Sequence, residues 1–190
     1  NFKDLVSLLD DSKIRDNKHD LKSLLYLLIK IADNHHRTSN FFSKIEQILQ
    51  LYETEVKENF SNFEIFNIFK TNKRIILFLI EKEIIKPDHS ISHIITSTKY
   101  KHRKYPEFFY PEFKTFFSED LCKEINYINQ ENQKNSDLFE EKRKIGENSN
   151  IISQIIRNDN VEDFIIYVTR TNISLFSQIE PSIFETNQFL

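Results

Sequence analysis

The chain has 190 residues, 39% of them hydrophobic, with a formal net charge of −3 and a single glycine. This nearly balanced charge gives no overall reason to expect nucleic acid or an acidic membrane as the partner. One glycine excludes a Gly-rich phosphate-binding loop and disfavours a sheet with many tight hairpins, so the composition favours helices.

A single cysteine, Cys122, excludes an intrachain disulfide and a cysteine-based zinc site. It fits a reducing compartment, and we expect an intracellular, cytoplasmic protein. The longest apolar runs are Leu24–Ile29 and Ile75–Ile80. Both fall far short of the roughly 20 residues that span a bilayer, so we expect no membrane insertion.

Two amphipathic helices are predicted at the start of the chain. Apolar residues recur every three or four positions from Leu21 to Ile29, which is the period of a helix with one buried face. Asn17 or Asp20 is placed to cap this helix. A second helix is predicted from about Phe41. Its apolar side consists of Phe42, Ile45, Ile48, Leu49, Tyr52 and Val56.

The middle of the chain carries clear helix boundaries. Ser61 and Glu64 form a capping-box pattern that opens a short helix through Lys70. After a polar turn, a strongly apolar helix is predicted over Arg74–Ile85, stopped before Pro87.

Asp88 is placed to cap a further short helix through Ser97. The aromatic-rich stretch Lys99–Phe117 follows and contains two near-repeats, Tyr-Pro-Glu-Phe from Tyr105 and again from Tyr110. Each proline suits a turn or the first turn of a helix, and we expect the aromatic clusters to dock on the preceding helices.

A longer helix is predicted from Ser118, with apolar positions at Leu121, Cys122, Ile125 and Ile128. From Gln130 to Ser136 the pattern becomes polar, as in a solvated helix extension or a linker. The basic triplet Lys142–Lys144 follows two glutamates and is predicted to be a solvated helix end.

The last part of the chain holds two short apolar helices, about Asn150–Arg157 and Val161–Arg170, separated by a polar turn. A second capping-box pattern at Ser182 and Glu185 predicts the start of another helix. Helices joined alternately by tight turns and longer loops are typical of an α-solenoid. Its units bury their apolar faces on neighbouring units.

The run Ile155–Glu162, followed by Phe164, Ile165 and Val168, resembles the middle of an ankyrin repeat. Asp159 stands where that family has a glycine at a tight turn, which an aspartate can also form. The capping box at Ser182 begins about 32 residues after Asn150, close to the ankyrin period of about 33 residues.

Three segments also look like the expanded ankyrin-repeat families of trichomonad protists: Lys142–Asn148, Ile155–Glu162 and Pro181–Asn187. In those proteins a helical amino-terminal region precedes regular repeats. The resemblance implies that residues 1–146 form a helical domain, either of degenerate helical repeats or as a separate helical cap, and that residues 147–190 form an ankyrin-like unit. It also implies that regular repeats follow Leu190 and that the chain has no catalytic residues.

The fold class predicted is therefore all-α, with stacked helical hairpins in a solenoid-like array and an ankyrin-like carboxyl-terminal end. The predicted function is non-catalytic protein–protein interaction or scaffolding, through apolar and aromatic side chains on one face.

The basic and aromatic stretch Lys99–Tyr105 is the sharpest local feature. Cationic side chains interleaved with aromatic rings are able to hold phosphates and stack bases, so nucleic-acid binding is the alternative function. A solvated loop or a charged rim of a protein-binding face is the favoured interpretation, because the chain is slightly acidic and Glu107 and Glu112 follow closely. The candidate partner-binding residues are Lys99, Tyr100, Lys101, Arg103, Lys104, Tyr105, Phe108 and Phe109.

His89 and His93 are four residues apart and would share one helix face, as metal ligands do. Position 90 is serine, where a zinc protease needs glutamate, and no nearby cysteine or histidine completes a ligand set. We expect surface histidines, no metal and no cofactor. The acids are spread along helix surfaces and Cys122 lies on an apolar face, so no enzyme activity is expected.

Overall fold

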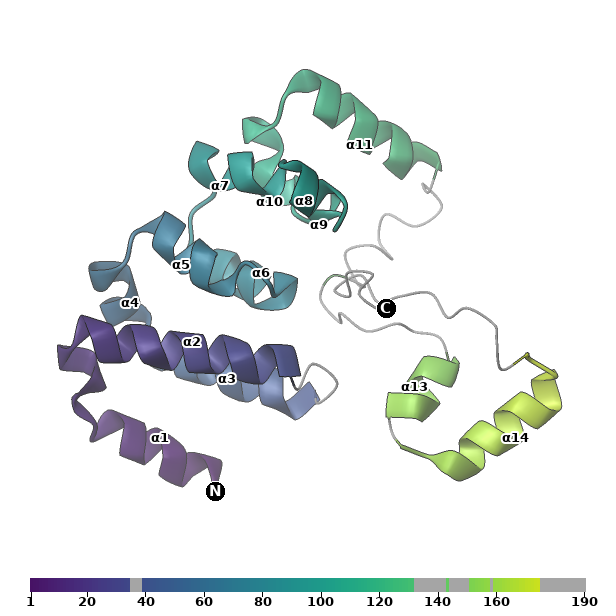
Figure 1. Ribbon diagram of the computed structural model, residues 1–190, viewed down its shortest axis with the longest axis horizontal. Coiled ribbons are helices and arrows are strands. Elements are labelled where there is room, and N and C mark those ends of the chain that lie inside the picture. The colour runs from purple at the N-terminus through teal and green to yellow at the C-terminus, as the bar shows by residue number, and fades with distance from the viewer. Residues whose placement is uncertain (35–38, 132–142, 144–150, 158, 175–190) are drawn as a thin grey trace. The chain divides into compact units, whose positions relative to one another are not determined.

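The computed structural model describes residues 1–34, 39–131, 143, 151–157 and 159–174 (Figure 1). Every regular element in these ranges is an α-helix or a short 3-10 helix, which confirms the all-α class. None of the described helices is both long and apolar enough to cross a bilayer. Residues 132–142, 144–150 and 175–190, which carry most of the predicted linker, the second capping box and part of the family resemblance, lie outside the described ranges.

The chain divides into two compact units, one of residues 1–97 with 111–117 and the other of residues 98–110 with 118–190. The domain boundary predicted near residue 146 falls outside the described residues. The helices of the first unit are α1 (Phe2–Asp10), α2 (Lys18–Asn34), α3 (Ser39–Leu51), α4 (Glu53–Asn59), α5 (Asn62–Phe69), α6 (Lys73–Glu81) and α7 (His89–Ile95), with 3-10 turns at Lys13–Asp16 and Lys114–Phe116. The described helices of the second unit are α8 (Thr98–Lys101), α9 (Tyr105–Phe108), α11 (Glu119–Glu131), α13 (Ile151–Arg157) and α14 (Val161–Thr171). Helix α10 (Tyr110–Phe113) begins with the last residue of the segment 98–110 and continues into the segment 111–117 of the first unit.

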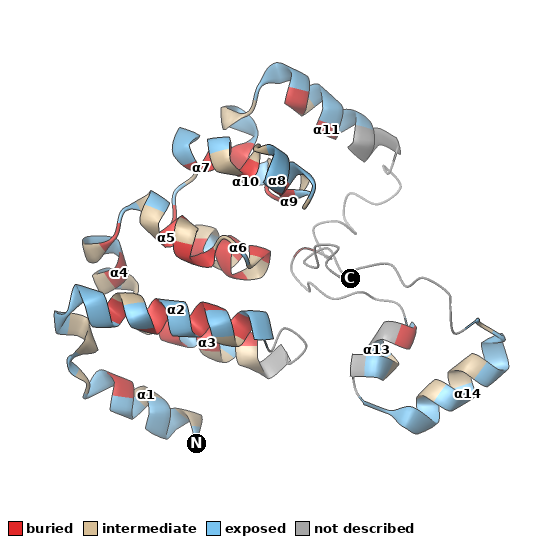
Figure 2. Cartoon of the chain, viewed as in Figure 1, coloured by how far each residue is buried: buried red, intermediate tan, exposed pale blue. Residues whose placement is uncertain are grey.

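Helices α2 and α3 bury the faces that their apolar periodicity predicts (Figure 2). The Asn17 side chain accepts a hydrogen bond from the backbone N–H of His19 (2.9 Å), so Asn17 caps α2, and Asp20 lies in its first turn. The predicted second helix breaks at Tyr52 into α3 and α4. Its apolar side is nevertheless buried throughout, at Phe42, Ile45, Ile48, Leu49, Tyr52 and Val56.

Helix α5 opens with the predicted capping box, in which Ser61 and Glu64 exchange side-chain and backbone hydrogen bonds. The turn after α5 is fastened to the end of α2. There the Asp33 carboxylate accepts hydrogen bonds from the Thr71 hydroxyl (2.9 Å) and the Asn72 amide (3.2 Å). The short α5–α6 hairpin is thereby held to the first long helix.

Helix α6 ends earlier than predicted, at Glu81 instead of Ile85. The stop is a Schellman turn: the N–H of Glu83 donates to the carbonyl of Ile80 (2.9 Å), and the N–H of Ile84 donates to that of Leu79 (2.8 Å). Glu83 takes φ of 54° at the position where helices usually place glycine. The helix end is therefore set by this turn rather than by Pro87, which the sequence interpretation missed because no glycine marks it.

Asp88 caps α7 as predicted, by accepting a hydrogen bond from the N–H of Ile91 (2.9 Å). The helix ends at Ile95, before the predicted Ser97. The Asn62 side chain accepts from the N–H of Lys86 (2.8 Å) and donates to the Asp88 carboxylate (3.0 Å). Asn62 therefore fixes the loop between α6 and α7 to the start of α5.

In the second unit, α13 and α14 are joined by another Schellman turn. The N–H of Asp159 donates to Ile156 (3.1 Å), and the N–H of Asn160 donates to Ile155 (3.2 Å). Asp159 takes φ of 51°, the left-handed backbone that its position in the tight turn requires. The Asn160 side chain then caps α14 through the N–H of Asp163 (3.1 Å).

Candidate functional site

The candidate partner-binding residues, positions 99–109, lie in α8, the turn after it, α9 and the residue that follows α9. The four aromatic residues among them are all buried: the exposed fraction is 6% for Tyr100 and at most 1% for Tyr105, Phe108 and Phe109. The ring centroids of Tyr100 and Tyr105 are 4.9 Å apart, and those of Phe108 and Phe109 are 4.7 Å apart, both in edge-to-face contact. Such pairs are favourable packing geometries.

This burial divides the candidate residues into an inner and an outer group. The rings provide a core that holds the turn, and they leave no free face on which a nucleic-acid base could stack. Burial also raises the pKa of the Tyr100 phenol, although the nearby charge of Arg103 opposes this change. Burial of Tyr105, Phe108 and Phe109 agrees with the expectation that the aromatic clusters are docked rather than exposed. Burial of Tyr100 did not follow from its spacing, since a helix this short has no clear periodicity.

The cationic residues form the outer group. Lys99, Lys101 and Lys104 are exposed, and Arg103 is half-buried. The Lys99 ammonium lies 5.9 Å from the centroid of the Tyr100 ring, close enough for a cation–π contact. The structure thus brings the predicted cations together on a short surface turn, with the predicted rings beneath them.

Arg143 is a residue that the sequence analysis misplaced. It was predicted within a solvated helix end, yet it is only 3% exposed, and its guanidinium carbon lies 5.1 Å from the centroid of the Phe108 ring. A basic triplet after two glutamates gives no signal for burial. Arginine is, however, the cation best suited to stacking on an aromatic face.

His89 and His93 both lie on α7 and are exposed. The His89 ring contacts Phe116 edge-on at 5.0 Å between centroids, and the neighbouring Asp88 carboxylate is engaged in capping the helix. Within the described ranges, no three His, Cys, Asp or Glu side chains are grouped so as to hold a metal ion. The pair therefore has no third ligand among these residues.

A hollow of about 300 Å³ lies in the first unit, between the end of α4, the start of α5 and the turn after α6. Two of its polar side chains are already engaged, because Lys57 pairs with Glu53 (2.6 Å) and Asn62 bonds the backbone of Lys86. These contacts leave few groups to recognise a ligand. The lining residues are Lys57, Phe60, Asn62, Ile65, Glu83, Ile84 and Lys86.

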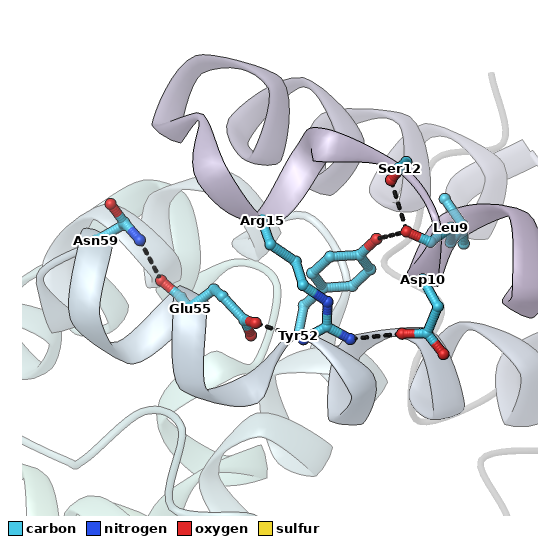
Figure 3. Close-up of polar contacts among 7 residues, drawn as sticks. All are labelled: Leu9, Asp10, Ser12, Arg15, Tyr52, Glu55 and Asn59. Atoms are coloured by element: carbon cyan, nitrogen blue, oxygen red, sulfur yellow. Dashed lines mark hydrogen bonds and ion pairs between the residues drawn. The ribbon is translucent and has the colours of Figure 1, made fainter.

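A polar cluster ties α1 to α3 and α4 (Figure 3). The Arg15 guanidinium pairs with Glu55 and with Asp10 (2.7 Å) and lies 4.8 Å from the centroid of the Tyr52 ring. The Tyr52 hydroxyl in turn donates to the carbonyl of Leu9 (2.8 Å). Hydrogen bonds to Glu55 and Asp10 raise the pKa of Arg15, so its charge is fixed. The cluster is structural, and its partners are too far apart in sequence to be predicted.

The last helix differs from the others in how its apolar residues are placed. Val161, Phe164, Ile165 and Val168 are spaced as one helical stripe, the apolar stripe of α14. None of them is buried: Val161 is 64% and Ile165 58% exposed, and the other two are half-buried. An amphipathic helix ordinarily covers such a stripe with a neighbouring element.

No family model matches this chain, and neither a curated protein nor a solved structure matches it. The ankyrin resemblance therefore remains a hypothesis based on residues Ile155–Glu162 and on the left-handed turn at Asp159.

Proposed function

We propose that the chain is a non-catalytic protein–protein interaction module that binds through the α13–α14 hairpin. The observation that carries the proposal is the apolar stripe of α14, which no described element buries. On α13, Ile151 and Ile156 are also largely exposed, at 55% and 46%. Contiguous exposed apolar side chains are typical of surfaces that bind another protein.

The hairpin is also where the ankyrin-like arrangement is proposed. Two short antiparallel helices joined by a tight turn are the building unit of ankyrin and other helical repeats. Such units stack apolar faces against their neighbours, which would account for a stripe that is apolar and uncovered. In this proposal the chain is a stack of helical hairpins, with the first unit as its closed, self-packed part.

The experiment is quantitative affinity capture from a nuclease-treated cell lysate. One variant replaces Val161, Ile165 and Val168 of the stripe by serine, and a matched variant replaces Leu5, Leu8 and Leu27, which are exposed apolar residues of the first unit. Because each buried aliphatic side chain contributes about 1.5–3 kcal/mol, loss of three from a binding face should reduce capture more than tenfold. The matched variant should retain the captured proteins.

Two results would contradict the proposal. One is a captured set that is the same for both variants and the unmodified chain. The other is a set that disappears on nuclease treatment of the unmodified chain, which would assign binding to nucleic acid.

A further inference from the structure

Helix α8 and the turn that follows it concentrate positive charge. Lys99, Lys101, His102, Arg103 and Lys104 fall within six consecutive positions, and all but Arg103 are exposed. None of the five forms an ion pair with any carboxylate in the part of the chain that the structure describes. Elsewhere Arg15 and Arg74 are paired with glutamates. We call these five residues the cationic turn.

Backbone hydrogen bonds within residues 98–104 stabilise the conformation of the cationic turn. The N–H groups of His102, Arg103 and Lys104 donate to carbonyls of residues 98, 100 and 101, at 3.2, 3.1 and 2.9 Å. Lys104 takes φ of 54°, a backbone conformation that disfavours a residue with a Cβ atom. Unfavourable backbone conformations of this kind persist where the surroundings determine them, and they concentrate at binding sites.

The buried rings complete this support. Tyr100 and Tyr105, which flank the cationic turn, are 6% and 0% exposed and contact each other. The nearest acid, Glu107, is half-buried with its Oε2 atom in the interior. That carboxylate oxygen is therefore not exposed beside the cations. A rigid support lowers the entropic cost of binding.

We propose that the cationic turn docks a short acidic segment of a protein partner, rich in aspartate or glutamate. This proposal rests on the protein-binding function above and names the chemistry of a second contact. A carboxylate-rich segment complements the unpaired cations. Single-stranded nucleic acid is disfavoured because the rings on which bases would stack are buried. A long polyanion would also meet a chain whose net charge is −3.

The test is fluorescence anisotropy with labelled probes on the whole chain. The probes are a ten-residue peptide of alternating glutamate and serine, the same peptide with glutamine for glutamate, and a mixed-sequence oligonucleotide of equal charge. One variant replaces Lys99, Lys101 and Lys104 by glutamine. A matched variant replaces Lys3, Lys13 and Lys30, which are exposed lysines of the first unit. Both variants change the net charge equally.

The acidic peptide is expected to bind, to lose at least tenfold in affinity in the Lys99/Lys101/Lys104 variant, and to keep its affinity within twofold in the matched variant. Binding should weaken as salt is raised, and the glutamine peptide should not bind. Absence of peptide binding, equal loss in both variants, or tighter binding of the oligonucleotide would overturn the proposal. Capture through the stripe of α14 does not depend on these lysines, so the protein-binding function would survive that failure.

Discussion

The first unit and the α13–α14 hairpin build their helices with the same local devices but cover them differently. In the first unit, helices α2 to α7 bury apolar faces, and long-range hydrogen bonds join the helices, as at Asp33 and Asn62. In the hairpin, α14 has no buried residue at all. Both regions use a side-chain N-cap and a Schellman turn.

This difference in burial shows that local sequence signals are enough to determine where a helix begins and ends. They do not determine whether another element packs on its apolar face. Most helical stability in proteins comes from burial of an apolar face. The first unit obtains this burial from its own helices, whereas α14 presents its stripe outward. The hairpin is therefore the part of the chain whose stability should depend most on a partner.

The largest expected effect is the difference in unfolding free energy between truncating a buried apolar residue of the first unit and truncating an exposed residue of the α14 stripe. Phe69→Ala in α5, where the ring is fully buried, should lower the free energy of unfolding by about 3–5 kcal/mol. Ile165→Ala in α14 should change it by less than about 0.5 kcal/mol. Urea denaturation followed by circular dichroism measures both. Phe63→Ala, at a 43% exposed position of α5, is the control for helix propensity, and equal losses at Phe69 and Ile165 would refute the contrast.

The next effect tests a long-range polar contact of the first unit, the pair of Arg15 and Glu55. Arg15→Met removes the partner of Glu55, one of whose carboxylate oxygens is buried without another hydrogen bond. Leaving that charge unpaired should cost about 1–3 kcal/mol of unfolding free energy. Lys57→Met breaks the more exposed pair with Glu53 and should cost only about 0.3–0.5 kcal/mol. A smaller loss for Arg15→Met than for Lys57→Met would show that the cluster in Figure 3 contributes no stability.

A third prediction compares how the stability contributed by two N-cap residues, Asp88 of α7 and Asn160 of α14, depends on pH. Burial acts to raise the pKa of Asp88, but hydrogen bonds from Ser90, Ile91 and Asn62 outweigh it, and the net pKa is lowered. The carboxylate therefore contributes stability above its unfolded pKa of about 3.9, and this contribution is lost as pH falls through the lower folded value.

Asp88→Ala and Asn160→Ala should each cost about 1 kcal/mol at pH 7, because each removes an N-cap. For Asp88→Ala the difference from the unmodified chain should shrink below about pH 4, since protonation removes the same interaction. For Asn160→Ala the stability difference from the unmodified chain should be the same at both pH values, because the side-chain amide of Asn160 does not titrate. Urea denaturation at pH 7 and pH 3 measures this, and a pH-independent cost at Asp88 would contradict the assignment.

The smallest expected effect concerns the two Schellman turns. Glu83→Gly should raise the free energy of unfolding by about 0.5–1 kcal/mol, because glycine takes φ of 54° without steric cost. Asp159→Gly should raise the free energy of unfolding by a smaller amount, since aspartate tolerates the left-handed region better than glutamate does. Thermal unfolding resolves the two substitutions, and destabilisation by Glu83→Gly would mean that the side chain makes contacts worth more than the strain.

Much of the first unit follows from sequence because its signals are local. The stripe from Leu21 to Ile29, the capping box at Ser61 and the cap at Asp88 each depend on residues a few positions apart. The end of α6 was misjudged because a glutamate occupies a position where glycine is the usual signal.

The candidate site was only partly accessible to the same reasoning. The cations of positions 99–104 are grouped as the sequence indicates, and the aromatic cluster from Tyr105 is buried as expected, but burial of Tyr100 depends on tertiary packing, which no local pattern records. Arg143 over Phe108 is a contact across 35 positions of sequence, and Arg15 with Glu55 is one across 40. Contacts this distant in sequence are specified only when the helices pack.

Native-state hydrogen–deuterium exchange, resolved by peptide, tests the central contrast most directly, because it compares covered and uncovered helices in one sample without a partner. Local opening is cheapest where few apolar contacts must be broken. Amides of α5 and α6 should be protected at least a hundredfold more strongly than those of α13 and α14. Equal protection of the two pairs of helices would show that the α14 stripe needs no partner, and would contradict the account.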